Sequence, residues 1–392
     1  MTWTTVETWA WRCLMPALLV GGTWASVCIL MAAVARFVSW RKRHPGEGWS
    51  WSMGSLWCLA YFGLQLVGGL WSDNAEAWRF SLEVKSSLWA LPLLAAMPGR
   101  PLSRDFWWSV GWSVVAYLIW RLLRAGWWHA IEGDASQWQY ARFAGDVHPT
   151  YLSLHAAVAW VGCGGQWAQR RGLSWAVTAL VAVSLGLMGS KAGIFSAAGV
   201  ATLALAFPLM WGPSEGKTKP QVVVFLALLT LSGWGASRQR FAEMGTAAAA
   251  VQSDAAPVQS SSAGRIAVWR ASAEIIARHP LGVGTGDVTD ALMSVYQRDG
   301  IAYASERRLN PHNQWLQAGV AFGWPGMLLL TLLLGWWFRM GWRRRNQWVM
   351  LCVCLVGMHA LVESVLEVQR GVVFILWLFV ATESAVRDPS KA

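Results

Sequence analysis

Charged residues are scarce in this chain of 392 residues. Asp, Glu, Lys and Arg together make up 14% of it, whereas hydrophobic residues make up 55%. An average soluble domain has about 25% charged residues. The composition therefore argues against a soluble domain and predicts a protein that lies in a membrane.

Cysteine is also scarce, and recognisable ligand motifs are absent. The six cysteines lie inside apolar segments without zinc-ligand or disulfide spacing, so we interpret them as small core residues. The sequence has no Walker motif and no internal repeat, and the glycines at 282, 284 and 286 are too weak a signal for a dinucleotide fingerprint. No basic region precedes the first apolar run, so we expect no cleavable signal peptide. We predict that the protein uses no cofactor.

Positive charge and tryptophan are what the chain has in excess. The formal net charge is +11, but Lys and Arg fall in short runs between apolar segments. This distribution indicates membrane topology rather than a nucleic-acid surface. Many of the 31 tryptophans lie near the ends of apolar segments, where an amphipathic ring suits the lipid headgroup zone. We expect contact with membrane lipids and none with nucleic acid.

Apolar segments long enough to cross a bilayer fill most of the chain. A transmembrane helix needs about 20 apolar residues. The first block is long enough to hide an additional short span or an interfacial helix. The sequence thus predicts an all-α polytopic membrane protein with about 11–12 transmembrane helices. The predicted spans lie near residues 13–38, 49–70, 79–97, 106–126, 149–167, 173–189, 192–211, 221–236, 313–338, 348–365 and 369–387.

The basic residues occupy alternate loops, which predicts the orientation of the chain. Inner loops are enriched in Lys and Arg, so loop 237–312 and the hairpin at Ser190 and Lys191 should face outward. Arg121 and Arg124, near an outer span end, fit this pattern poorly. The inner clusters are Arg41-Lys42-Arg43, Arg100 with Arg104, Arg170-Arg171, Lys217 with Lys219, and Arg339 with Arg343-Arg344-Arg345.

This topology divides the chain into three parts. Residues 1–236 form N-terminal transmembrane helices, residues 237–312 a large outer loop with short helices, and residues 313–392 C-terminal transmembrane helices with an inner tail. Small residues at 245–264 predict a flexible start to the loop. Helical spacing from Gly264 predicts an amphipathic helix on the outer membrane surface. Its apolar face would contain Ile266, Trp269, Ala273, Ile276 and Ala277.

Three residues on the outer side are candidates for chemistry. Arg265 opens the loop helix, where a guanidinium and a helix N-terminus suit phosphate. His312 lies where the chain re-enters the membrane and can accept a proton near pH 7. Lys191 lies between two apolar spans with almost no loop, and an interfacial charge of this kind is a functional candidate. Lipid anchoring is the structural alternative for Arg265 and Lys191, as helix capping is for His312.

A second group of polar residues has mainly structural interpretations. His148 begins another span on the same side and is a pocket candidate, although we favour a structural role. His359, Glu363 and Glu367 have spacing that would place them on one helix face. Glu367 and Arg370 could pair with each other or bind a polar sugar. Glu83 and Lys85 look like a pair within one span, and we assign them no chemistry.

Several motifs resemble the bacterial O-antigen ligase and polymerase superfamily. The matching segments are GRIAVWRASAEIIARHPLGVGTGD from residue 264, HNQWLQAGVAFGWPGM from residue 312 and LVESVLEVQRGVVFILWLF from residue 361. In that family an arginine opens a loop helix, a P-x-G-x-G turn follows, and a His-Asn pair precedes a span with a G-x-x-G. These features correspond here to Arg265, the turn 280–284, His312 with Asn313, and Gly323 with Gly326.

The resemblance implies a GT-C-like membrane glycosyltransferase of the bacterial inner membrane with its site facing the periplasm. The donor would be a glycan on undecaprenyl diphosphate and the acceptor a hydroxyl of the lipid A-core. His312 would be the general base, while Arg265, Lys191 and Arg270 would bind the diphosphate. Many ligases have arginine where Lys191 stands, and lysine lacks the bidentate fork. Asn313, His148, Glu367 and Arg370 are possible pocket or acceptor contacts.

The chemistry would proceed with inversion at the anomeric carbon and without a metal. We find no acidic cluster on the outer side with the spacing of a Mg²⁺ or Mn²⁺ site. A polymerase that joins carrier-linked repeat units remains an alternative to a ligase, as does a relative that glycosylates proteins. A transporter would need buried charges along its spans, and a membrane scaffold would leave the convergence of His312, Arg265 and Lys191 unexplained.

Overall fold

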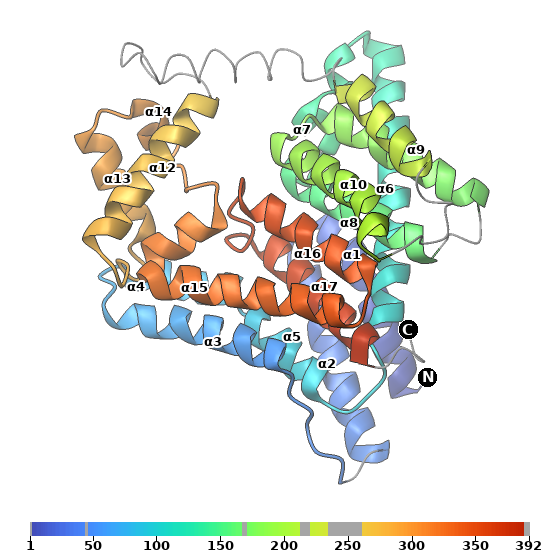
Figure 1. Cartoon of the computed structure of the whole chain (residues 1–392), viewed down its shortest axis with the longest axis horizontal. Helices are drawn as coiled ribbons and strands as arrows, with labels where there is room; N and C mark the ends of the chain where they lie inside the picture. Colours follow the sequence, from blue (N-terminus) through green and yellow to red (C-terminus); the bar gives the residue numbers. More distant parts are fainter. Residues whose placement is uncertain (1, 44–45, 167–170, 212–219, 234–260, 388–392) are drawn as a thin grey trace.

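The computed structural model describes residues 2–43, 46–166, 171–211, 220–233 and 261–387. Within these ranges the regular structure is helical throughout (Figure 1). Arg170, Lys217 and Lys219 lie outside the described residues, as does most of the stretch 245–264. The prediction of an all-α polytopic membrane protein is confirmed.

The first half of the chain contains most of the helical bundle. Its longer helices follow the predicted spans, and short helices connect them. They are α1 (Trp3–Val20), α2 (Trp24–Arg43), α3 (Met53–Val67), η1 (Gly68–Leu70), α4 (Ala75–Val84), α5 (Ser87–Ala96), α6 (Ser103–Glu132), η2 (Ala135–Trp138), α7 (Tyr140–Ala144), α8 (Pro149–Gln166), α9 (Arg171–Met188) and α10 (Lys191–Trp211).

The second half holds the loop helices and the last three long helices. A helix over Pro220–Gly233 precedes them. The others are α12 (Ser261–Arg278), α13 (Val288–Arg298), α14 (Ala302–Glu306), α15 (Gln314–Arg343), α16 (Gln347–Ala360) and α17 (Gln369–Arg387). In the described residues, four helices are long and apolar enough to cross a membrane: those at 24–42, 53–70, 103–132 and 314–343. Shorter apolar helices lie between them.

Two predicted spans differ from the structure. The segment predicted near 13–38 is two helices, α1 and α2, which turn at Gly21 and Gly22, both with positive φ. The segment predicted at 79–97 is broken at Lys85 and Ser86 into α4 and α5. At the break, the Lys85 side chain is buried and donates to Gln65 of α3 and to Ser81 of α4.

The buried face of helix α12 differs from the predicted apolar face, and its location on the outer membrane surface stays a prediction. Ala273 and Ala277 are exposed. The buried positions are Val268, Ala271, Ser272, Ile275 and Ile276. They pack with α13, α14 and the first part of α15 into a small hydrophobic core beside the main bundle (Figure 1). Tertiary packing therefore decides which face of α12 is buried.

The P-x-G-x-G turn docks this small core onto α15. Gly323 interrupts α15 with φ 62° and ψ −148°. Beside this break, the N–H groups of Val283 and Gly284 donate to the carbonyls of Val320 and Ala321 at 2.9 and 3.0 Å. A Cβ on Gly323 would lie 1.8 Å from the carbonyl oxygen of Pro280. The glycines of both motifs permit close backbone contact between the loop and α15.

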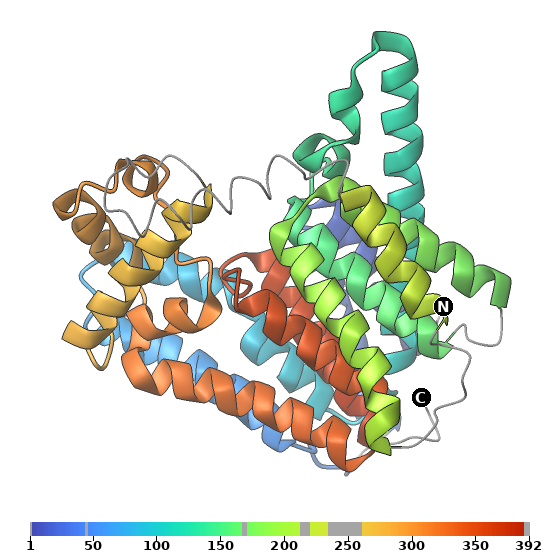
Figure 2. The same ribbon diagram turned by 45° about the horizontal axis from the view of Figure 1, so that its top comes forward.

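Arg121, which fits the charge pattern poorly, has a structural role. Its side chain is buried and donates to the carbonyls of Phe143 and Arg142. It thereby ties α7 to α6, whose end projects beyond the rest of the bundle (Figure 2). A basic residue engaged in this way carries no information about topology.

Candidate functional site

The loop at 361–368, between α16 and α17, supplies the centre of the site. Because α16 ends at Ala360, Glu363 and Glu367 lie in this loop, and the prediction that they share a helix face with His359 is wrong. The Glu363 carboxylate is 7% exposed. Its Oε1 lies 3.0 Å from Nδ1 of His312 and accepts the N–H of Ser364 at 3.2 Å.

His312 is held in an unusual backbone conformation. Its φ is +46°, which non-glycine residues rarely adopt. Its N–H donates to Oδ1 of Asn310 at 2.9 Å, and the preceding carbonyl of Pro311 accepts from the Trp269 indole of α12 at 2.8 Å. Strained backbone of this kind is concentrated at functional sites. The contacts fix the position of an imidazole that is still 24% exposed.

Arg265 reaches the same loop from the second turn of α12. Its Nη1 donates to the carbonyl of Val362 at 2.9 Å, and its Nη2 lies 4.0 Å from Oε2 of Glu363. The side chain is 25% exposed. Arg265 and His312 therefore approach Glu363 from two separate segments, and both remain accessible to a ligand.

The charge of Glu363 is maintained despite its burial. Burial alone would raise the pKa of this carboxyl group. The hydrogen bond and charge of His312, together with the charge of Arg265, outweigh that effect and hold the pKa below its ordinary value. An ionised Glu363 can only accept, so the hydrogen bond requires Nδ1–H of His312 to be the donor. It thus favours the tautomer whose Nε2 can accept a proton from a ligand.

Asn313 and Gln314 hold the loop in place, and a contact of Asn313 with a ligand stays a prediction. The Asn313 amide oxygen caps α15 by accepting the N–H groups of Trp315 and Leu316, and its amide nitrogen donates to the Leu361 carbonyl at 2.9 Å. Gln314 donates to Glu367 at 3.1 Å and accepts the Leu366 N–H at 2.7 Å. The start of α15 and the loop therefore form one polar unit.

Two predicted ion pairs are replaced by others. Nζ of Lys85 lies 2.8 Å from Oε2 of Glu367, so its partner is Glu367 rather than Glu83. Glu83 is exposed. Arg370 donates to the carbonyl of Asp146 at 2.7 Å instead of pairing with Glu367. The observed partners, Lys85 with Glu367 and Arg370 with Asp146, are far apart in sequence, whereas the residues of each predicted pair are two or three positions apart.

Lys191 and His148 are two further predicted site residues. Lys191 begins α10, where it is half-buried. One turn further, Ser196 contacts His359 near the end of α16 at 3.1 Å, so Lys191 lies at the same end of the bundle as His312. His148 is exposed just before α8, and its Nδ1 accepts the Thr150 N–H at 3.3 Å. The roles of both in ligand binding stay predictions.

Arg270 is exposed on α12, and its role in binding phosphate also stays a prediction. It follows Arg265 by five residues, which is about 140° around a helix. The two guanidinium groups therefore leave α12 on different sides. Among the described residues, no group of three or more His, Cys, Asp or Glu side chains is arranged to hold a metal ion.

Residues 176–331 match the family model for O-antigen ligase. The match supports an assignment to the O-antigen ligase and polymerase superfamily. It runs from α9 to the middle of α15 and includes Lys191, Arg265 and His312. No curated protein matches the chain. Members of this superfamily are membrane enzymes that resemble glycosyltransferases, in agreement with the predicted family and class of enzyme.

Glu363 is the residue that sequence reasoning missed as the partner of His312. It lies beyond the part that matches the O-antigen ligase model. The sequence contained a signal, because a carboxylate in an apolar region needs a partner. However, 51 residues separate it from His312, and only the folded chain shows that they meet.

Proposed function

We propose that this protein is an O-antigen ligase. It transfers a glycan from undecaprenyl diphosphate to a hydroxyl of the lipid A-core, with inversion of configuration and without a metal ion. The observation that carries the proposal is the contact of His312 with Glu363, with Arg265 beside it. The match of residues 176–331 to the family model for O-antigen ligase supports the proposal.

The residues have complementary roles in this reaction. Nε2 of His312 takes the proton of the acceptor hydroxyl as the oxygen forms its bond to the anomeric carbon. The bond between that carbon and the diphosphate oxygen breaks, and the diphosphate leaves with both electrons. Arg265 stabilises the charge that develops on it. Glu363 keeps the imidazole in the required tautomer and stabilises the imidazolium that forms, as the carboxylate of a catalytic triad does.

Lys191 and Arg270 are the further contacts that we propose for the diphosphate. The site lies on the periplasmic face of the inner membrane, where a flipped carrier lipid is accessible. The positive loops support this orientation, because the site is at the end of the bundle opposite Arg343, Arg344 and Arg345.

The variant His312→Ala tests the base. We expect the purified protein to keep its fold and to lose transfer of a carrier-linked glycan by about 10²- to 10⁴-fold, the usual contribution of a general base. His279→Ala is a matched control, since His279 is exposed near the end of α12. Transfer at the wild-type rate by His312→Ala would refute the assignment.

A gene deletion separates a ligase from a polymerase. Loss of a ligase leaves long glycan on the carrier lipid and core without glycan. Loss of a polymerase leaves single repeat units on the core. Analysis of the surface polysaccharide of the deletion strain therefore decides between the two.

A further inference from the structure

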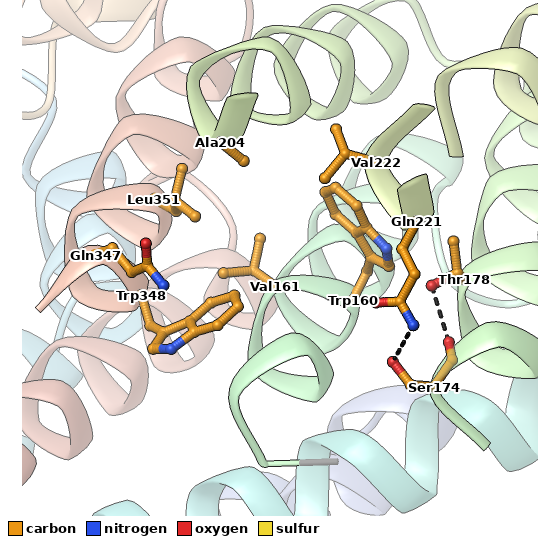
Figure 3. A pocket seen from close by; sticks show the side chains of 10 residues that line it. All are labelled: Trp160, Val161, Ser174, Thr178, Ala204, Gln221, Val222, Gln347, Trp348 and Leu351. Carbon is orange, nitrogen blue, oxygen red and sulfur yellow. Dashed lines mark hydrogen bonds between the residues drawn. The ribbon is translucent and has the colours of Figure 1, made fainter. Parts of the chain in front are cut away.

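A pocket lies far from His312, at the opposite end of α16. It lies between α8, α9, α10, the helix at 220–233 and α16 (Figure 3). Gln347 and Trp348, the first residues of α16, form one side. At 1.5 Å per residue, the length of α16 places this side about 20 Å from the end of the helix next to Glu363. The pocket is thus separate from the candidate site.

The pocket has an apolar wall and a polar rim. The wall consists of aliphatic side chains and two indoles, and Trp160 is itself fixed by stacking on Phe225 at 3.8 Å between ring centroids. The polar groups of the rim come from residues near the beginnings of helices. Gln221 donates to Ser174 at 3.0 Å (Figure 3). The Gln347 amide also lines the pocket and has no hydrogen-bond partner among the described residues. Ligand pockets typically combine an apolar lining with a few polar groups in this way. The apolar liners are Trp160, Val161, Ala204, Val222, Trp348 and Leu351.

Positive charge lies directly beside the rim. Arg343, Arg344 and Arg345 are exposed and immediately precede Asn346 and Gln347. None of the three makes an ion pair with another residue that the structure describes. Basic groups beside a pocket between transmembrane helices are typical of sites for anionic lipid headgroups.

We propose that this pocket binds an anionic phospholipid. One acyl chain would pack against the indoles and aliphatic side chains, the ester groups would accept hydrogen bonds from the Gln347 amide, and the phosphate would face the three arginines. An uncharged ligand would not use the positive charge beside the rim, and a soluble anion would leave the apolar wall unfilled. The site is independent of glycan transfer.

Binding can be measured by native mass spectrometry of the purified, delipidated protein with added phosphatidylglycerol or phosphatidylcholine. We expect phosphatidylglycerol to bind at least tenfold more tightly. Val222→Trp should fill the pocket and weaken this binding at least tenfold. Val224→Trp is the matched control, because Val224 lies on the same helix but is 37% exposed. Equal effects of the two variants, or equal binding of the two lipids, would overturn the proposal.

Two further variants keep the test decisive if Val222→Trp does not fold. Ala204→Phe enters the pocket from a half-buried position on α10. Replacement of Arg343, Arg344 and Arg345 by glutamine changes only exposed side chains. We expect both to reduce phosphatidylglycerol binding, the second without changing phosphatidylcholine binding. Unchanged binding in both would exclude the site, whatever the outcome of the transfer assay.

Discussion

At the scale of single residues, Glu363 connects the two groups to which the proposed chemistry is assigned. One carboxylate oxygen contacts His312, and the other faces Arg265. Arg265 also donates to the Val362 carbonyl, which holds the guanidinium near the partly exposed imidazole of His312. A lysine at position 265 would keep the charge but could not span both contacts in one plane. We therefore propose that Glu363 is a positioning residue for His312.

The variant Glu363→Gln tests this role. An amide can present the wrong group to Nδ1 and favour the tautomer that cannot accept the proton, a change that costs about 10⁴-fold in a serine-protease triad. We expect kcat for glycan transfer to fall by about 10²- to 10⁴-fold and KM for the donor to change much less. Glu274→Gln, which alters an exposed ion pair on α12, should leave both unchanged. A fall in donor affinity alone would contradict the positioning role.

The same variant has a predictable dependence on pH. The pKa of Glu363 is below its ordinary value of 4.5 in the folded protein. Its ionisation therefore adds stability above that value, and this stability is lost as the pH falls through the folded pKa. Thermal unfolding should show the wild type to be more stable than Glu363→Gln at pH 7. The difference should shrink below about pH 4.5, and a constant difference would show that ionisation is not its source.

At the scale of elements, the break in α15 couples the loop core to the bundle. Gly323→Ala would place a Cβ 1.8 Å from the Pro280 carbonyl oxygen, at a φ of 62°. We expect a loss of about 2–4 kcal/mol in stability, since the strain alone costs about 1–3 kcal/mol, and faster proteolysis within 261–312. Gly335→Ala is the control on the same helix, because nothing lies within 4 Å of its Cβ. Equal thermal stability of the two variants would show that the loop does not depend on this contact.

The elements also show which features a sequence can predict. The long helices were predictable because the length of an apolar run is a local property. The ion pair of Lys85 was not, because its partner Glu367 is distant in sequence. Motifs predicted Arg265 and His312 as site residues. Their partner Glu363, in the loop at 361–368, was missed because α16 was expected to continue past Ala360. The buried face of α12 was also missed, because α13 and α15 determine it.

At the scale of the whole molecule, the polar contacts separate into two groups at opposite ends of the bundle. At the proposed outer end, Arg370 contacts the Asp146 carbonyl and the region of Gly21. At the other end, Arg36 pairs with Glu7 at 2.8 Å and donates to the carbonyl of Arg100. The contacts of Arg370 with Asp146 and of Arg36 with Arg100 each join segments that the positive charges assign to the same side. Glu7 lies beside Arg36 because α1 and α2 are two helices, whereas the single predicted span at 13–38 would place Glu7 at the opposite end. The two carbonyl contacts support the proposed orientation.

Thiol labelling tests this orientation directly. Arg307 and Arg344 are both exposed and lie beyond opposite ends of α15. In cells with a permeabilised outer membrane, a reagent that cannot cross the inner membrane should label Arg307→Cys. It should label Arg344→Cys only after the inner membrane is broken. The unsubstituted protein gives the background, since Cys13 is exposed. The opposite pattern would place His312 in the cytoplasm, where a flipped carrier lipid does not reach it, and the proposed reaction would then lack its donor.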